Sequence, residues 1–445
     1  MELQGIHTLY LCYFGLREPL VQTQVLPYLR ELVAGGMRVS LLTFEPEMEE
    51  RWSTESVASM RAQLQAEGIS WHSLPYHKSP SLPATLYDIW AGARLASELA
   101  RREQVQILHA RAHIAATMGA LAKWRLGRQK IKLIFDIRGF MPEEYTDAGV
   151  WPEQGWLYKG VKAVERRLLK SSDAFIVLTR RASEILFPAS IGTGEKEDEG
   201  RPIEVIPCCV DAHRFRAAEA LNRDELRSSL KMTDRSVLVY VGSLDGWYLT
   251  EEMLDFCAQA HARDPRTFTL LVTQRDVEQA RQRLLAKGIS AQDFLVTSAT
   301  PAEVPRYLRA ADIALSFIKP CYSKQASSPT KVAEYLAAGL PVVSNAGIGD
   351  LDELITGENV GIILRDFSPS AYEHGLAELE TLSAETAMRA RCQAVAHAQF
   401  DLHEVGGQRY RRLYKRLLSP QDSFFAELES PEPSVNLSYF SEGKR

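Results

Sequence analysis

With 445 residues, of which 45% are apolar and 24% charged, the chain is long enough for two domains with full cores and has the composition of a globular protein. A net charge of −5 excludes a general attraction to nucleic acid, and no apolar run approaches the roughly 18 residues of a membrane-spanning helix. The N-terminus lacks the basic lead and cleavage site of a secretory signal, so we expect a cytoplasmic protein. Six scattered cysteines indicate reduced packing residues.

Short β-rich runs alternate with helical patterns, which is typical of parallel α/β sheets. A helical period covers 21–35, the charged run 190–202 predicts a solvated loop, 399–418 predicts a terminal helix, and residues beyond Pro420 predict a flexible tail. Two groups of strands are predicted, the first at 7–13, 39–44, 106–109, 132–136 and 174–178, the second at 236–242, 268–273, 294–297, 313–317 and 341–345.

The stretch 327–350 combines a helix start, a helix stop, a buried strand and a glycine turn. Ser328 followed by Pro329 predicts the start, because a serine oxygen can cap free amides and proline suits the first helical position. Gly339 predicts the stop. Lys331 lies one turn into this helix, so the exposed amides and the cation together suit a phosphate.

Glu334 follows Lys331 by three residues, which places both side chains on one face of the helix in apolar surroundings. The two oxygens of a carboxylate match the two vicinal hydroxyls of a ribose. The alternative is an exposed ion pair on a solvated helix. The helix start and the glycine turn favour the ligand-binding interpretation.

This stretch resembles the donor-binding signature of the family 4 retaining glycosyltransferases, which have the two-domain GT-B fold. Three further segments resemble that family in its order: 203–211 with Phe215 as the passage between domains, 238–243 as the first strand and turn of the donor domain, and 303–314 as the helix and strand before the signature. The resemblance implies an α/β protein with two Rossmann-like parallel-sheet domains facing across a cleft. It places them at 1–208 on the acceptor side and 209–398 on the nucleotide-sugar side, followed by a crossover helix at 399–418 and a tail at 419–445.

Two departures from the family pattern concern the donor. Ala326 stands where the family has the first of two glutamates, and Ser243 stands where it commonly has an arginine for the diphosphate. Another cation must serve, with Lys331 the first candidate. The expected donor site comprises Glu334, Lys331, Ser327, Ser328, Gly15, Gly242, Ser243, Lys324, Arg275 and Ser298.

In the resembled family a histidine after the strand at 106–109 touches the donor sugar, and His113 is our first choice for it. For His109, a buried core histidine with its hydrogen bonds satisfied is an almost equally good interpretation. Asp136 and Arg138 stand where relatives have a catalytic-loop histidine, so they either orient an acceptor hydroxyl or form an internal salt bridge that locks the loop.

The loop after the first strand is expected to face the cleft, because open parallel sheets bind ligands beyond the carboxyl ends of their strands. Gly15 would allow close approach to the diphosphate. Arg17 and Glu18 either meet the acceptor or form a surface ion pair.

The implied reaction transfers a hexose from a nucleotide diphosphate sugar to a hydroxyl of a glycan or lipid-linked glycan, with retention of configuration, as in bacterial polysaccharide or glycolipid synthesis. The catalytic candidates are His113, Arg138, Asp136 and Lys331. We expect no cofactor and no metal, since Asp350 and Asp352 fit better as acids at a helix start. A nucleotide-sugar 2-epimerase of the same fold and an inactive nucleotide-sugar-binding protein are the alternatives.

Residues 101–170 contain fourteen Lys or Arg against seven Asp or Glu. Within them Trp124 lies among cations, and Trp156, Leu157, Val161, Val164 and Leu168 follow a helical stripe beside basic residues. This pattern predicts peripheral docking on an anionic membrane. The alternative for each segment is a core stripe with a solvated basic face.

Overall fold

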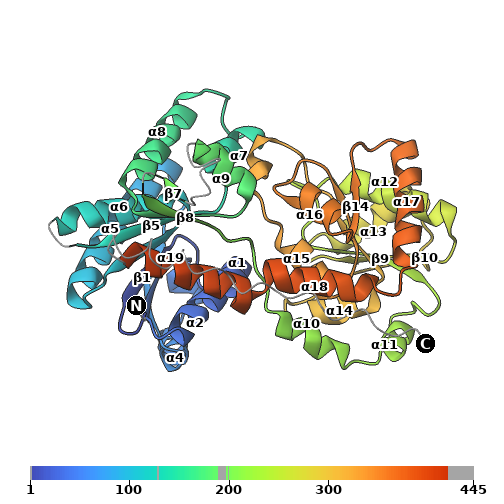
Figure 1. Cartoon of the computed structure of the whole chain (residues 1–445), viewed down its shortest axis with the longest axis horizontal. Helices are drawn as coiled ribbons and strands as arrows, with labels where there is room; N and C mark the ends of the chain where they lie inside the picture. The colour runs from blue at the N-terminus through green and yellow to red at the C-terminus, as the bar shows by residue number, and fades with distance from the viewer. Residues whose placement is uncertain (1–2, 128–129, 189–196, 199, 419–445) are drawn as a thin grey trace, which may run out of the picture.

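The computed structural model describes residues 3–127, 130–188, 197–198 and 200–418, which form two α/β domains side by side (Figure 1). Each domain is built on its own sheet. The first sheet contains β1 (His7–Cys12), β2 (Arg38–Pro46), β3 (Ile69–Tyr76), β4 (Ile107–Arg111), β5 (Lys132–Ile137), β6 (Ala174–Val177), β7 (Glu197–Asp198) and β8 (Arg201–Val205). The second contains β9 (Ser236–Val241), β10 (Thr267–Val272), β11 (Phe294–Thr297), β12 (Ile313–Ser316), β13 (Val342–Asn345) and β14 (Gly361–Leu364).

Helices connect the strands of both sheets. Those of the first domain are α1 (Pro19–Gln24), α2 (Leu26–Ala34), α3 (Met48–Arg51), α4 (Thr54–Ala66), α5 (Ser81–Arg102), α6 (Ala112–Leu126), α7 (Met141–Asp147), α8 (Trp156–Ser171) and α9 (Arg180–Leu186). The later helices are α10 (Ala212–Glu219), α11 (Arg223–Ser229), α12 (Thr250–Arg263), α13 (Val277–Ala286), α14 (Val304–Ala310), η2 (Tyr322–Ala326), α15 (Thr330–Ala337), α16 (Leu351–Gly357), α17 (Pro369–Ser383), α18 (Met388–Phe400), η3 (Leu402–Gly407) and α19 (Gln408–Leu418).

The strand order is β3-β2-β1-β4-β5-β6-β8-β7 in the first sheet and β11-β10-β9-β12-β13-β14 in the second. Every described pairing is parallel except that of β7 with β8. The central strands are buried on both faces, as the apolar sequences of β1 and β10 require when helices cover both sides of a sheet. The predicted GT-B fold with two Rossmann-like domains is confirmed.

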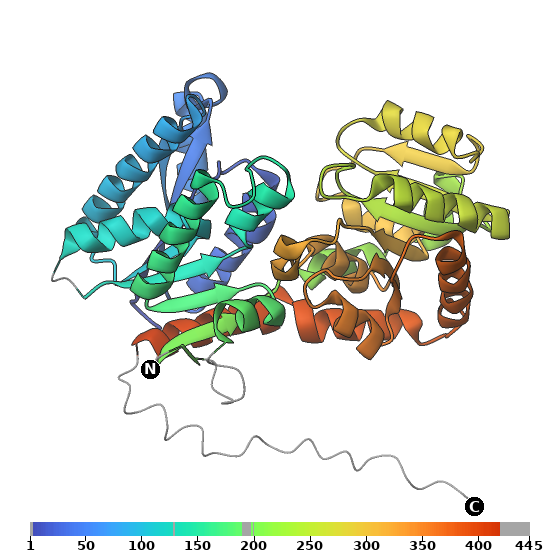
Figure 2. The ribbon, with the colours of Figure 1, turned by 90° about the horizontal axis from the view of Figure 1, so that it is seen from above.

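The two faces of the first sheet carry separate apolar cores. Leu9 and Leu11 of β1 point to the core beneath α5 and α6, whereas Tyr10 and Cys12 point to the core beneath α2 and α19. This alternation follows from the two-residue period of a strand. α19 therefore belongs to the first domain although it is the last described helix, and α18 and α19 follow each other along one side of both domains (Figure 2).

The chain crosses between the domains twice, and the two crossings are hydrogen-bonded to each other. Val210 donates to the carbonyl of Phe400 at 2.8 Å, and Leu402 donates to the carbonyl of Val210 at 3.0 Å. A second set of contacts joins the domains through α7 and η2, where the N–H of Ser323 donates to Asp147 at 2.9 Å.

Several expectations about local structure were wrong. The helical period at 21–35 is divided at Val25, the region 399–418 contains a separate segment η3, and β3 and β14 were not predicted. The predicted loop at 190–202 already contains β7 and the start of β8, while its residues 189–196 and 199 and the predicted tail lie outside the described part of the chain. Over the described residues, no helix is long and apolar enough to cross a membrane.

The start of α15 also differs from the expectation. Pro329 occupies the capping position instead of the first helical position, and the helix begins at Thr330. Ser328 does not cap the helix, because its hydroxyl accepts the N–H of Cys208 at 3.1 Å from the crossing segment. The predicted stop is confirmed: Gly339 has φ +76°, and its N–H donates to the carbonyl of Leu336 at 2.9 Å.

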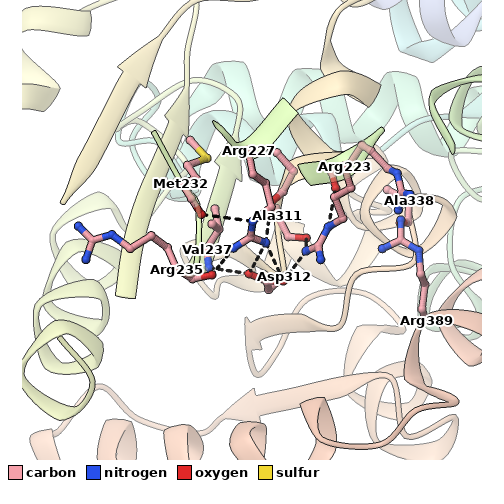
Figure 3. A network of polar contacts seen from close by, with 11 residues as sticks. Arg223, Arg227, Met232, Arg235, Val237, Ala311, Asp312, Ala338 and Arg389 are labelled. Atoms are coloured by element: carbon pink, nitrogen blue, oxygen red, sulfur yellow. Dashed lines mark hydrogen bonds and ion pairs between the residues drawn. The ribbon is translucent and has the colours of Figure 1, made fainter. Parts of the chain in front are cut away.

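A polar network anchors the second sheet at the end opposite to the carboxyl ends of its strands (Figure 3). Asp312, just before β12, accepts hydrogen bonds from Arg223, from Arg227 at 3.1 and 3.2 Å, and from the N–H of Val237 at 2.8 Å. Arg227 also donates to the carbonyl of Ala310 at 3.2 Å. The network thus links α11, α14, β9 and β12.

Candidate donor site and interdomain cleft

The carboxyl ends of the strands of the first sheet face the second domain. α7 follows β5 and contacts η2 through Asp147 and Ser323, and the hydroxyl of Thr179, after β6, donates to the carbonyl of Gln325 at 2.8 Å. Both segments lie where an open parallel sheet binds ligands. The cleft between the domains is therefore bordered by the loops after these strands and by the elements around α15.

Lys331 lies in an aromatic enclosure at the start of α15. Its Nζ is 4.0 Å from the ring centroid of Tyr240 and 3.9 Å from that of Tyr248. The residue is 9% exposed, and its Nζ has no hydrogen-bond partner among the described residues. Burial lowers the pKa of Lys331 to about 7, against an opposing effect of Glu334. Such a buried, unpaired amine is ready to bind an anion.

Gly242 explains how the amine comes so close to the backbone. This glycine follows β9 with φ +141°, and a Cβ built on it would lie 2.8 Å from Nζ of Lys331. Tyr248 belongs to the loop that continues from Gly242 toward α12, so this loop covers the amine. Ser243 in the same loop is exposed, and its carbonyl accepts the hydroxyl of Tyr240.

Glu334 lies on the face of α15 that borders a cavity of about 570 Å³ between the domains. Its carboxylate is 17% exposed and lies 4.0 Å from Nη1 of Arg214 on α10. Burial raises the pKa of Glu334, whereas Arg214 and Lys331 act in the opposite direction. Thr330 lines the cavity from the same helix, and Gln24 lines it from the first domain. The carboxylate is thus open to a ligand that fills the cleft.

Other residues expected in the donor site hold the two domains together. Lys324 lies 3.3 Å from Glu144 of α7, and its Nζ is 3.8 Å from the ring centroid of Trp247. Ser327 donates its N–H to the carbonyl of Lys324 at 3.1 Å, so this amide is already used. Ala326 is 2% exposed within an apolar core of the first domain, where an ionised glutamate would be unpaired.

Arg275 and Ser298 are exposed in the loops after β10 and β11, at the carboxyl edge of the second sheet. Beside Ser298, the N–H of Thr300 donates to Glu303 at 2.8 Å. On the opposite domain, the three residues of the first loop have partners of their own. Gly15 donates its N–H to Glu18 at 3.1 Å, whereas Arg17 lies 3.8 Å above the ring of Trp52.

Gly15 is required by packing. A Cβ at this position would lie 2.7 Å from the ring of Pro46 and 3.2 Å from the carboxylate of Glu45. The site predicted from the sequence therefore separates in space: Lys331, Glu334, Gly242 and Ser243 lie together, whereas Gly15, Arg17 and Glu18 form a local loop structure on the other domain.

His113 lies inside the first domain. It is 2% exposed, its Nε2 lies 2.9 Å from Glu165 of α8, and its ring meets the edge of Phe135 at 5.2 Å. His109 is fully buried and lies 2.8 Å from the hydroxyl of Tyr414. Neither ring borders the cavity beside Glu334.

Asp136 and Arg138 take part in a buried charge network. Asp136 is fully buried, 3.5 Å from Arg138 and 3.8 Å from Arg111, and it accepts from Tyr410 of α19 at 3.5 Å. Burial acts to raise the pKa of Asp136, but Arg138, His109 and Arg111 outweigh it and lower the pKa to about 2. This geometry agrees with the internal salt bridge, one of the two interpretations left open by the sequence.

Asp350 and Asp352 both accept hydrogen bonds from backbone N–H groups. Asp350 accepts the N–H groups of Arg180 at 2.7 Å and Arg181 at 3.1 Å, at the start of α9 in the first domain. Asp352 accepts the N–H of Gly347 at 3.1 Å. Over the described residues, no group of three or more His, Cys, Asp or Glu could hold a metal ion.

Two family models match the chain. The model described as "Glycosyl transferase 4-like domain" matches residues 21–189, and "Glycosyl transferases group 1" matches residues 222–397. The chain belongs to the family 4-like glycosyltransferases. Each model covers one of the two domains, so the division seen in the glycosyltransferase agrees with that of the family.

Solved structures share the fold of this glycosyltransferase over nearly its whole length. A glycosyltransferase from Rickettsia africae ESF-5 is 15% identical, with 93% of this chain and 99% of that chain covered and a TM-score of 0.67. HepE of Anabaena in complex with UDP is 16% identical (92% and 100% covered, TM-score 0.63). WaaG, a glycosyltransferase involved in lipopolysaccharide biosynthesis, is 17% identical (92% and 99% covered, TM-score 0.60). Curated protein sequences gave no match.

Sequence reasoning missed three side chains of the candidate donor site. Tyr240 and Tyr248 enclose Lys331, and Arg214 faces Glu334. Arg214 could have been found, because it directly precedes Phe215 in the segment that resembles the family. The two tyrosines carried no signal, since a tyrosine in a buried strand or a loop usually packs in a core.

Proposed function

We propose that this glycosyltransferase transfers a hexose from a nucleotide diphosphate sugar to a hydroxyl of a glycan or lipid-linked glycan, with retention of configuration. The observation that carries the proposal is the unpaired amine of Lys331, held against Gly242 at the start of α15. The amine is one helical turn from Glu334, which suits a ligand that has a diphosphate next to a ribose. The UDP complex of HepE supports the same class of donor.

Each side chain has a distinct role in this proposal. The ammonium group of Lys331 neutralises the diphosphate as negative charge develops on the leaving group. Glu334 accepts hydrogen bonds from the ribose hydroxyls, and Arg214 keeps this carboxylate ionised. Because Tyr240 and Tyr248 cover the amine, the loop 242–249 must shift when the donor binds.

We propose that the sugar is transferred with retention and without a protein nucleophile. Apart from Glu334, the carboxylates named above are capped, paired or buried, so we assign no side chain to attack on the sugar. The oxygen of the leaving phosphate accepts the proton of the acceptor hydroxyl on the same face of the sugar. Asp136 and Arg138 then support the loop below the acceptor, and His113 supports the packing of α6 on α8.

Thermal-shift assays with the diphosphates of uridine, guanosine, adenosine, cytidine and thymidine test the donor class, because a bound ligand stabilises the fold by mass action. We expect one or two of them to raise Tm, Lys331→Met to abolish the shift, and Lys170→Met on exposed α8 to preserve it. A shift that survives Lys331→Met would remove this lysine from the site.

Incubation with the matching nucleotide sugars then tests the reaction. Transfer or slow hydrolysis with the released sugar in its original anomeric form supports a retaining transferase, which proton NMR distinguishes. An isomerised donor would indicate the epimerase, and binding without turnover would indicate a binding protein.

We also propose that the first domain docks on an anionic membrane, where it meets a lipid-linked acceptor. Trp124 at the end of α6 is 78% exposed and Trp156 at the start of α8 is 73% exposed. Of the predicted stripe on α8, Leu168 is buried, whereas Val164 remains exposed. The exposed basic residues of α8 are Lys159, Arg166, Arg167 and Lys170.

Co-sedimentation with vesicles of phosphatidylcholine alone or with 30 mol% phosphatidylglycerol tests this docking. Each cation near the surface contributes roughly 1 kcal/mol, so recovery with anionic vesicles should be high and fall with salt. The double variant Trp124→Ser, Trp156→Ser should lose it, and Leu285→Ser, at an exposed leucine of the second domain, should not. Equal recovery with both kinds of vesicle would favour a soluble acceptor.

A further inference from the structure

A histidine and a carboxylate are paired at the end of β3, outside the donor residues. Asp88 of α5 is 1% exposed and accepts the hydroxyl of Tyr13 at 2.7 Å and the backbone N–H of His77 at 3.1 Å. Its other oxygen lies 2.6 Å from Nδ1 of His77. Burial and the hydrogen bond to Asp88 raise the pKa of Tyr13, so its hydroxyl remains a donor.

This arrangement fixes which nitrogen of His77 is available to a ligand. An ionised carboxylate only accepts hydrogen bonds, so Nδ1 carries the proton toward Asp88. In the neutral ring, Nε2 therefore keeps a lone pair. The side chain of His77 is 42% exposed, so the ring is open to solvent beside its contact with Asp88.

The pair lies on the edge of the first sheet that borders the second domain. Tyr13 follows β1 and His77 follows β3, at the same carboxyl edge as the segments after β5 and β6 that contact η2. β3 is the outermost strand of that sheet, so His77 lies at the open end of this edge, away from the contact between α7 and η2.

Two exposed aromatic rings adjoin His77. Tyr87 is 54% exposed, and its ring lies 5.2 Å from that of His77 at 87°. Trp90 is 50% exposed, with its ring 5.9 Å from that of Tyr87 and 37° from parallel. Large aromatic rings gain by covering their faces, and these two remain half exposed one helical turn apart on α5. The guanidinium of Arg94 lies 5.9 Å from the ring centroid of Trp90.

A pyranose ring matches this combination. Its C–H faces pack on aromatic rings, and its hydroxyls, arranged around the rim, donate to nitrogen lone pairs. We propose that His77, Tyr87 and Trp90 form a subsite for a pyranose ring of the acceptor, with Asp88 as the positioning residue for His77. Only the identification of this sugar as the acceptor rests on the proposed function. Binding of a pyranose ring at the subsite does not depend on a donor.

The polar pair decides between a sugar and a membrane at this place. A lipid surface would use the aromatic rings alone and would gain nothing from a histidine oriented by a fully buried carboxylate. A sugar uses both. The subsite is also separate from Trp124 and Trp156, which lie on α6 and α8.

Saturation-transfer NMR with the methyl α- and β-pyranosides of glucose, galactose, mannose and N-acetylglucosamine tests the subsite without donor or turnover. We expect at least one glycoside to receive saturation from the wild-type chain. Trp90→Ala and His77→Ala should each weaken its affinity about fivefold or more. His77→Gln should retain part of the affinity, since its amide can still bind a hydroxyl.

Three controls separate the possible failures. Trp124→Ala removes a tryptophan that is even more exposed than Trp90 and should leave glycoside binding unchanged, as should Lys331→Met, which removes nucleotide binding. Tyr13→Phe keeps the ring and removes one donor to Asp88, so a modest effect is expected. The proposal is overturned if no glycoside of the panel binds, if Trp90→Ala and His77→Ala bind as the wild type does, or if Trp90→Ala reduces only the recovery with anionic vesicles. A wild-type chain that binds a glycoside but none of the nucleoside diphosphates would instead count against the donor proposal alone.

Discussion

Lys331 shows at the scale of one residue how binding and stability conflict. The amine lies between two tyrosine rings with no hydrogen-bond partner among the described residues, and the helix that carries it must be buried to form the cleft. The rings compensate part of the lost hydration, because their faces attract a cation. The part of the lost hydration that the rings do not compensate lowers the pKa of Lys331 to about 7.

Binding of the diphosphate should weaken as pH rises above 7. In the free protein Lys331 loses its proton near this pH, whereas the complex needs the ammonium group. The affinity should therefore fall by up to about tenfold per pH unit between pH 7 and 9. Calorimetry with the tightest-binding nucleoside diphosphate measures it. In Lys331→Arg, which stays charged, a slope as steep as that of the wild type would assign the titration to another group.

Lys331→Met should stabilise the ligand-free fold at pH 7 and below. The unfolded chain binds this proton up to the ordinary pKa of 10.5, but the folded chain releases it near 7. The wild-type free energy of unfolding should therefore rise with pH between about 7 and 10.5. The destabilisation caused by the buried ammonium group is largest below pH 7. Urea denaturation at pH 6 and pH 10 measures the difference, which should be larger at pH 6. A variant less stable than the wild type at pH 6 contradicts this account.

Glu334→Ala should abolish measurable donor binding and leave the fold intact. The variant removes charged hydrogen bonds to the ribose, which contribute on the order of 2–3 kcal/mol. Arg214 stays partly exposed, and the buried Lys331, which loses the opposing effect of Glu334, can release its proton, so we expect the variant to fold. Calorimetry with the same diphosphate is the measurement, and Glu373→Ala, at an exposed carboxylate of α17, is the control. Unchanged affinity in the folded variant would exclude Glu334 from the site.

At the scale of elements, the network around Asp312 joins segments that are distant in the chain. Arg227 is 9% exposed at its side chain and has Asp312 as its counter-charge (Figure 3). Removal of one partner of a buried pair leaves an uncompensated charge, which costs more than the pair contributes. This is a feature of stability, remote from the donor site.

Asp312→Ala should lower the free energy of unfolding by about 3 kcal/mol. In the double variant Asp312→Ala, Arg227→Met, Arg227 no longer leaves an uncompensated charge. The decrease in its free energy of unfolding should therefore be smaller than the sum of the decreases in the two single variants. Denaturant titrations of the four proteins in the cycle give these values. Additive losses would show that the two side chains act independently.

The elements that the sequence predicted well are those with a strong local signal. The central strands of both sheets are continuous apolar runs, and α15 ends at Gly339 because only a residue that tolerates positive φ can follow there. The strand β3 was missed because it is half-exposed at a sheet edge and contains Pro75. The start of α15 was misplaced because the hydroxyl of Ser328 bonds to Cys208, a contact between distant residues that no local pattern contains.

The same limit applies to the candidate site. Lys331 and Glu334 are near each other in the chain, so helical geometry was enough to pair them. The interior position of His113 was not foreseen, because its orientation depends on Glu165 in the next helix but one. The tyrosine enclosure of Lys331 required the three-dimensional approach of β9 and α15, which residue spacing does not encode.

At the scale of the whole molecule, the cleft should work without a metal ion. Asp350 and Asp352 are engaged with backbone N–H groups, and Lys331 supplies the positive charge. We therefore expect transfer or donor hydrolysis to persist in excess EDTA, as measured by release of the nucleoside diphosphate. Complete loss that manganese or magnesium restores would instead indicate a metal-dependent transferase.

The place of α19 has a consequence for how the protein is made. Tyr410, Leu413 and Tyr414 complete the apolar core on one face of the first sheet, and the hydroxyl of Tyr410 completes the contacts of Asp136. During synthesis the first sheet leaves the ribosome some two hundred residues before this helix does. While the second domain is translated, one face of the first sheet is therefore covered by α2 but not by α19. A chaperone that binds exposed apolar segments should associate with the ribosome-bound protein until α19 emerges. If the gene were divided between the domains, the first domain made alone would lack α19, and its apolar core would stay incomplete.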